Sequence, residues 1–142
     1  MIINSDRAMI NFGEKIGQAL HGGEVLTLVG DIGAGKTTLV KGIARGMKIE
    51  EDVQSPSYTI SRVYEAPNTL RLAHYDFYRL DEAGILSGEL VEDLNDPQTV
   101  TIIEWSDIVR GVLPKKHTTI NIKAISETER EVDISGSLGD LT

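Results

Sequence analysis

The sequence predicts a three-layer α/β domain whose sheet is parallel at its centre and antiparallel at its edges. Two short runs dominated by apolar residues, 25–29 (VLTLV) and 99–105 (TVTIIEW), have the composition of central parallel strands that are buried on both faces. Segments around the first run repeat their apolar residues with the period of a helix, whereas the C-terminal part of the chain alternates polar with apolar residues. This mixture is typical of helices packed against a mixed sheet.

Two helices are predicted in the N-terminal third of the chain. Residues 4–20 (NSDRAMINFGEKIGQAL) place apolar side chains at spacings of three and four, which gives the helix one apolar face, and Ser5 or Asp6 can cap it. The turn HGGEV separates this helix from the first buried strand. A second helix is predicted to follow the glycine-rich run 30–38 (GDIGAGKTT) and to end near Gly46.

The rest of the chain is predicted to add a hairpin, short helices and a closing pair of strands. Residues 59–80 contain two extended runs separated by APNT, and residues 81–98 have the polar, mixed composition of short helices with a solvated acidic face. The run 99–105 forms the second buried strand and carries a carboxylate near its end. The alternating segments 117–126 and 130–136 are expected to form an antiparallel pair.

Composition excludes several classes of protein. The chain has 142 residues without a repeat or a composition break, so we expect one domain over residues 1–142. A net charge of −8 argues against a protein that binds nucleic acid over a large part of its surface. The absence of cysteine excludes disulfides and a catalytic thiol. Because we find neither a signal peptide nor a run near the roughly 20 apolar residues of a membrane helix, we expect a cytoplasmic location and no membrane partner.

The GDIGAGKTT run has the pattern of a phosphate-binding loop. Its residues Gly30, Gly33, Gly35, Lys36 and Thr37 satisfy G-x-x-x-x-G-K-[ST]. Glycines allow consecutive backbone N–H groups to point into one concavity, and the helix that follows directs the positive end of its dipole at the same place. A buried strand before the glycines and a helix after them form the context in which this pattern binds nucleotide phosphates.

Two side chains of the loop have distinct expected roles. Lys36 supplies a mobile cation for the β- and γ-phosphates of a nucleotide, and the Thr37 hydroxyl can join the coordination shell of Mg²⁺. The loop residues that we expect to contact the cofactor are Gly30, Asp31, Gly33, Ala34, Gly35, Lys36, Thr37 and Thr38.

Two acidic residues are candidates to hold the metal ion that accompanies a nucleotide. Glu104 ends the second buried strand, at the carboxyl edge of the sheet, and Asp76 in HYDFYRL is the second candidate. His74 shares a strand face with Asp76, and a lone histidine is more often part of the packed structure than a catalyst. We expect Arg79 to form a salt bridge with a nearby aspartate rather than to reach the γ-phosphate, and Trp105 to pack in the core or at an interface.

Three functional classes remain open on these residues alone. An ATPase, a small-molecule kinase and a nucleotide-sensing module without useful hydrolysis all fit the loop. The sequence has no N-K-x-D tetrad, which disfavours a GTPase. Residues 81–97 contain no arginine, whereas small nucleoside kinases usually bring several arginines to a lid over the phosphates.

Four segments in a fixed order are more specific than the loop. GDIGAGKTT, SPSYTI, HYDFYRL and IIEW closely resemble, in order and spacing, the motifs GDLGAGKTT, SPTYTL, HFDLYRL and IEW of the bacterial tRNA threonylcarbamoyladenosine biosynthesis ATPase family TsaE (YjeE). The resemblance covers essentially the whole chain and implies a P-loop NTPase-like fold. It also implies an enzyme that binds ATP or ADP with Mg²⁺ and hydrolyses ATP slowly. Its partners would be TsaD and TsaB, which modify adenosine 37 of ANN-decoding tRNAs, so contact with tRNA would be indirect.

The resemblance also assigns roles to individual residues. The Mg²⁺-binding threonine and glutamate of the family fall on Thr37 and Glu104, and its essential aspartate falls on Asp76. Asp76 would either orient the attacking water or act as an outer-shell metal ligand, a choice that the sequence leaves open. With Lys36 in the loop, the residues implied to be catalytic are Lys36, Asp76 and Glu104.

A switch near the γ-phosphate is implied at residues 55–59 (SPSYT), where Ser55 and Thr59 are expected to contact the cofactor. Within this segment Ser57 replaces the usual threonine of the family, which keeps a hydroxyl but loses a methyl group. No adenine contact is carried over from the resemblance. Arg130 lies where the C-terminal hairpin could approach the base.

Overall fold

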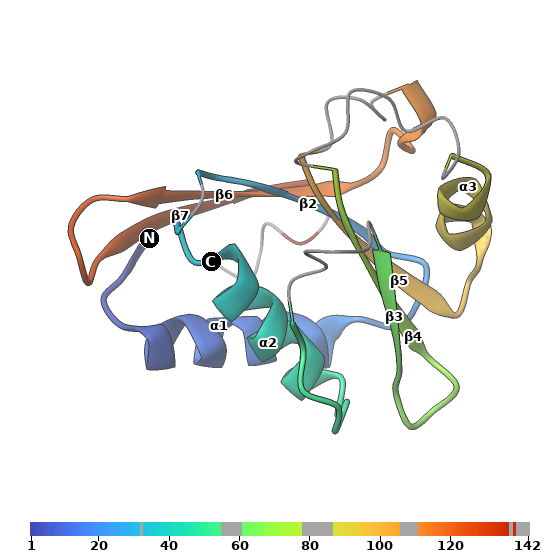
Figure 1. The fold of residues 1–142 in the computed structure, drawn as a ribbon, viewed down its shortest axis with the longest axis horizontal. Coiled ribbons are helices and arrows are strands. Elements are labelled where there is room, and N and C mark those ends of the chain that lie inside the picture. Colours follow the sequence, from blue (N-terminus) through green and yellow to red (C-terminus); the bar gives the residue numbers. More distant parts are fainter. Residues whose placement is uncertain (32, 55–60, 78–86, 106–110, 137, 139–142) are drawn as a thin grey trace.

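The computed structural model describes residues 1–31, 33–54, 61–77, 87–105, 111–136 and 138, and its strands form one sheet (Figure 1). In these residues the strands are β1 (Ile2–Ile3), β2 (Val25–Val29), β3 (Ser61–Glu65), β4 (Arg71–Asp76), β5 (Thr99–Glu104), β6 (Thr118–Ala124) and β7 (Arg130–Ser135). Their order across the sheet is β1-β7-β6-β2-β5-β4-β3. The described helices are α1 (Asp6–Ala19), α2 (Lys36–Gly46) and α3 (Ser87–Asn95).

The sheet has a parallel centre and antiparallel edges, as predicted. The four central strands β4, β5, β2 and β6 run parallel to one another, whereas β3 pairs antiparallel with β4, and β7 pairs antiparallel with both β6 and β1. The pair β6 and β7 is the predicted C-terminal hairpin. No pattern in the sequence indicates β1, because a strand of two residues is too short to show a period.

Helices cover both faces of the sheet, which confirms the predicted three layers (Figure 1). On one face, Leu26 of β2 and Ile102 of β5 are fully buried in a cluster that includes Leu39 of α2. On the other face, Ile103 of β5 packs in a second cluster with Leu90 of α3. Because both faces of β5 are covered, this strand is buried along its whole length, and its apolar sequence follows from that burial.

Strand β4 is also buried on both faces, although its sequence alternates polar with apolar residues. Leu72 packs in the cluster on the α1 and α2 face, and Ala73 and Tyr75 pack in the cluster on the α3 face. The Tyr75 hydroxyl donates a 2.5 Å hydrogen bond to Oδ2 of Asp93 in α3. Burial, this hydrogen bond and the negative charge of Asp93 raise the pKa of the Tyr75 phenol. The polar atoms of Tyr75 and Asp93 therefore satisfy each other inside the protein.

Both N-terminal helices lie where the sequence predicts them. Ser5 caps α1, because its hydroxyl accepts a 3.0 Å hydrogen bond from the N–H of Ala8, and α2 ends at the predicted Gly46. In the described part of the chain, no helix has the length and apolar character needed to cross a membrane.

Helices α1 and α2 cross at a contact that is lined by glycines. Gly13 and Gly17 of α1 face Gly42 and Gly46 of α2, and the two backbones meet without intervening side chains. A Cβ atom built on Gly17 would lie only 2.2 Å from the carbonyl oxygen of Ile43. This close approach leaves no room for side chains between the helices and fixes α2 against α1.

The substitution Gly17→Ala is expected to destabilise the protein, because a methyl group at this position overlaps the backbone of α2. Overpacking of this kind costs about 1–3 kcal/mol of unfolding free energy, which chemical denaturation measures. Gly88→Ala in α3 is the control, since a Cβ at Gly88 meets no atom within 4 Å. Equal losses of stability in the two variants would contradict this account of the helix crossing.

Candidate functional site

The phosphate-binding loop connects β2 to α2, as predicted. Gly33 and Gly35 have φ angles of 83° and 106°, a region that residues with a Cβ enter only at a cost. A Cβ on Gly30 would lie 2.6 Å from the carbonyl oxygen of Ile122 in β6, so a third glycine is needed where the chain leaves the sheet. Within the described residues no side chain caps α2, so the first N–H groups of this helix are left for a ligand.

The ammonium group of Lys36 folds back into its own loop. Its Nζ donates a 2.7 Å hydrogen bond to the carbonyl oxygen of Gly30 and lies 3.6 Å from Oε1 of Glu104. Nζ also lies 4.4 Å from the centroid of the Trp105 ring, within the range of a cation–π contact. Because the Lys36 side chain is only 7% exposed, its charge depends on these contacts for stabilisation.

The carboxylate of Glu104 lies between two partners. Its Oε2 is 2.6 Å from Nε2 of His74, and its Oε1 faces Lys36. A carboxylate can only accept a hydrogen bond, so Nε2 of His74 is assigned as the donor. His74 is fully buried and Glu104 is 3% exposed, so the imidazole orients this carboxylate from inside the protein. This arrangement agrees with the expectation that His74 belongs to the packed structure.

Asp76 and Glu104 lie side by side at the carboxyl edge of the sheet, the edge that the sequence predicts for Glu104. They are Cα partners in the parallel pairing of β4 with β5, and Glu104 is in turn the partner of Leu28, next to the end of β2. Side chains at paired positions of parallel strands point to the same face, so both carboxylates share the face that carries α2. The sheet therefore brings the loop and the two carboxylates that are predicted to bind the metal to one edge.

The predicted metal ligands have the chemistry that Mg²⁺ requires. The Thr37 hydroxyl and the carboxylates of Glu104 and Asp76 are hard oxygen donors. In the described part of the chain, no three histidine, cysteine or acidic side chains gather into a metal-binding cluster. Mg²⁺ is usually held by one or two carboxylates together with substrate phosphates and water, so these residues fit a metal that enters with a nucleotide.

The other predicted residues are placed as follows. The loop residues from Asp31 to Thr38, apart from position 32, lie between the end of β2 and the first turn of α2. The predicted switch at 55–59 and Arg79 lie outside the described residues. Trp105 packs against the apolar cluster on the α3 face, as predicted.

Two contacts at the site are not predicted from the sequence. One is the stacking of Trp105 on Lys36. The other is made by Arg130, which donates hydrogen bonds of 3.0 Å to the carbonyl oxygen of Ala34 and 3.5 Å to that of Gly33. Its partners lie 96 and 97 positions away in the chain, and no local pattern could indicate such a contact.

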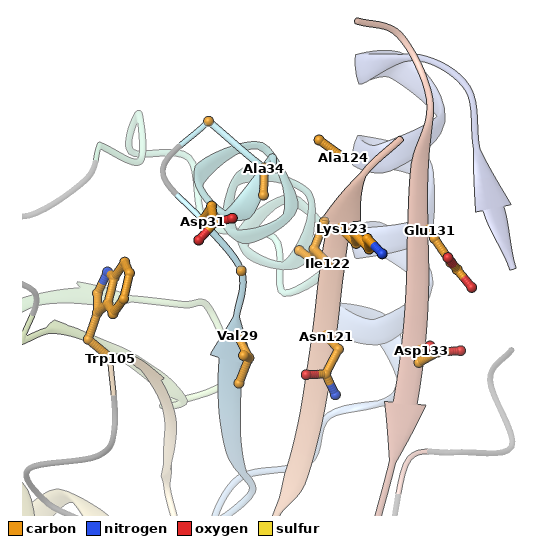
Figure 2. A pocket seen from close by; sticks show the side chains of 12 residues that line it. Val29, Asp31, Ala34, Trp105, Asn121, Ile122, Lys123, Ala124, Glu131 and Asp133 are labelled. Atoms are coloured by element: carbon orange, nitrogen blue, oxygen red, sulfur yellow. The ribbon is translucent and has the colours of Figure 1, made fainter. Parts of the chain in front are cut away.

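A cavity of about 550 Å³ lies beside the loop (Figure 2). It is lined by the loop, by Trp105 and by residues of β6 and β7. Its charged side chains are the carboxylates of Asp31, Glu131 and Asp133 and the single ammonium group of Lys123. Phosphate groups are therefore better accommodated at the α2 end of the loop, where Lys36 and the free N–H groups of the helix gather.

Comparison with known proteins gives consistent matches. The family model for threonylcarbamoyl adenosine biosynthesis protein TsaE matches residues 3–132. A Bacillus subtilis protein named tRNA threonylcarbamoyladenosine biosynthesis protein TsaE is 39% identical over 110 residues, which cover 78% of this chain and 68% of that protein. A Treponema pallidum protein of the same name is 33% identical over 124 residues, 87% of this chain and 90% of that protein. The crystal structure of Bacillus subtilis YdiB has a TM-score of 0.72 and 27% identity, and the match covers 99% of this chain and 85% of that chain.

The contact between Lys36 and Trp105 gives a direct signal of ligand binding. Trp105 is the single tryptophan of the chain, so a ligand phosphate that draws Lys36 away is expected to change the intrinsic fluorescence. Lys36→Ala should abolish this change and weaken ADP binding about ten- to a hundredfold, the cost of a charge-assisted hydrogen bond. Titration with MgADP, followed by fluorescence and by calorimetry, measures both effects. An unaltered fluorescence change in Lys36→Ala would show that Lys36 does not move toward the phosphate.

Proposed function

The chain belongs to the threonylcarbamoyl adenosine biosynthesis protein TsaE family, and on this premise we propose that it is a Mg²⁺-dependent ATPase that serves threonylcarbamoyladenosine formation in tRNA. The related proteins of Bacillus subtilis and Treponema pallidum carry that pathway in their names. The observation that carries the proposal is the buried set of Lys36, Glu104 and His74 directly behind the phosphate-binding loop.

The loop residues bind and orient the nucleotide. Backbone N–H groups of the loop and of the first turn of α2 hold the phosphates, and Lys36 exchanges its contact with Gly30 for a phosphate oxygen. Thr37 and Glu104 hold Mg²⁺, which neutralises charge on the phosphates when it is bound. His74 keeps its hydrogen bond to Glu104 and so maintains the direction of the carboxylate during this exchange.

Asp76 is the second carboxylate of the site. Its place beside Glu104 at the end of the sheet suits either of two roles, orienting the water that attacks the γ-phosphate or holding a water of the metal shell. Both roles require the carboxylate to be ionised, and the role of orienting the water would make Asp76 matter for hydrolysis rather than for binding ADP.

We propose that turnover is slow and depends on partners, and a buried ion pair supports this proposal. Lys36 and Glu104 are 3.6 Å apart and stabilise each other, so each must give up a favourable contact before it can serve phosphate or metal. We propose that the TsaD and TsaB pair favours the arrangement in which Lys36 contacts the phosphates and Glu104 contacts the metal. We also propose that the protein acts in the cytoplasm. With a net charge of −8, the protein is expected to reach tRNA only through these partners.

Phosphate release from MgATP, measured with and without a TsaD–TsaB pair, tests this proposal. We expect the pair to stimulate release, and Lys36→Ala and Glu104→Ala to lower the rate by about a hundredfold or more, as the loss of transition-state charge stabilisation does. Lys41→Ala and Glu92→Ala, at exposed positions, are the matched controls.

Three outcomes would contradict the proposal. Release that the pair does not change, with no complex detected, would exclude the partnership. Transfer of phosphate to an added nucleoside or metabolite would indicate a kinase, and stable ATP binding without release in any mixture would indicate a nucleotide sensor.

A further inference from the structure

Arg130, at the start of β7, ties the phosphate-binding loop to the β6–β7 turn. Its Nε donates a 3.0 Å hydrogen bond to the carbonyl oxygen of Ala34, and Nη2 donates one of 3.5 Å to that of Gly33. On the other side, Nη1 donates hydrogen bonds of 2.8 and 3.0 Å to the carbonyl oxygens of Ser126 and Glu129. Among the described residues, every hydrogen bond of this guanidinium goes to a backbone carbonyl.

These contacts decide which way two peptide groups of the loop face. In a planar trans peptide the C=O and the N–H point in opposite directions. Because the Ala34 carbonyl points toward Arg130, the N–H of Gly35 in the same peptide group points away from Arg130. The N–H of Ala34 already donates to the carbonyl oxygen of Asp31, so the Gly35 N–H is the next one available to a phosphate.

Arg130 is itself held firmly in the sheet. Its Cα pairs with Ala124 of β6 on one side and with Ile3 of β1 on the other, and Ile3 is buried. Two residues further along β7, Val132 exchanges backbone hydrogen bonds with Met1, at 2.9 Å from the Val132 N–H and 3.1 Å from the N-terminal ammonium. The short strand β1 thus braces the strand that carries the guanidinium.

We propose that Arg130 is a positioning residue for phosphate recognition, a role that rests on the proposed nucleotide binding. By fixing the carbonyls of Gly33 and Ala34, it presents the Gly35 N–H to the β-phosphate of the nucleotide. A lysine cannot replace it, because one ammonium group cannot reproduce a planar fork that reaches carbonyls on both the loop and the turn. The ligand class that depends on Arg130 is any diphosphate, with or without a base.

The test compares the affinities of ADP and inorganic pyrophosphate for the wild type, Arg130→Ala and Arg130→Lys, each measured by displacement of a fluorescent ADP analogue. Both substitutions should weaken both ligands by about ten- to a hundredfold while the denaturation midpoint stays close to that of the wild type. Guanidinium ion at millimolar concentration, against sodium chloride at equal ionic strength, should restore binding to Arg130→Ala and not to Lys36→Ala. The control Arg45→Ala removes an ion pair with Glu14 at the far end of α2 and should leave both affinities unchanged.

Unchanged affinities in both Arg130 variants would overturn the inference. Weaker binding of ADP alone would also overturn it, because that result would place Arg130 at the base. Loss of binding together with loss of folding in both variants, without rescue of Arg130→Ala by guanidinium, would assign the arginine a purely structural role and overturn the inference. A wild-type protein that binds neither ADP nor pyrophosphate would instead refute the proposed nucleotide binding itself.

Discussion

The burial of the Glu104 carboxylate at the end of β5 is the constraint on which the site depends. A charge that is 3% exposed is stable only with partners, and here Lys36 and His74 supply them. The contact with Glu104 holds the side chain of Lys36, and the contact with His74 orients the carboxylate. Under the proposed function, Lys36 and Glu104 would have to exchange these stabilising contacts for phosphate and metal, and the proposed partners would favour that exchange.

The sheet and the helices make this arrangement possible. Parallel pairing of β2, β5 and β4 brings the loop, Glu104 and Asp76 to one edge, where ligands bind in folds of this kind. The glycine-lined crossing of α1 and α2 fixes the helix whose N-terminus is proposed to receive the phosphates. Arg130 adds hydrogen bonds to two carbonyl oxygens of the loop, those of Gly33 and Ala34. The loop is thus held by a sheet, a helix and a cation that lie far apart in the sequence.

Features that depend on local sequence were predicted, and features that depend on contacts between distant segments were not. The glycine pattern, the helix caps and the apolar run that ends at Glu104 each reflect a local physical requirement, so the loop and its strand-end carboxylates could be placed from the sequence. The polar residues of β4 hid the burial of both its faces, because Tyr75 finds its partner on α3 and His74 finds its partner on β5. The role of Arg130 and the strand β1 depend on pairing across most of the chain, which no periodicity reveals.

The dependence of ADP affinity on Mg²⁺, measured by calorimetry for the wild type and for Glu104→Gln, tests the central claim most directly. If Glu104 is the buried carboxylate that exchanges Lys36 for a metal ion, Mg²⁺ should strengthen ADP binding to the wild type. In Glu104→Gln most of that dependence should disappear, while ADP without Mg²⁺ should bind at least as well, because Lys36 is no longer held by an opposite charge. The same Mg²⁺ dependence in both proteins would contradict the account.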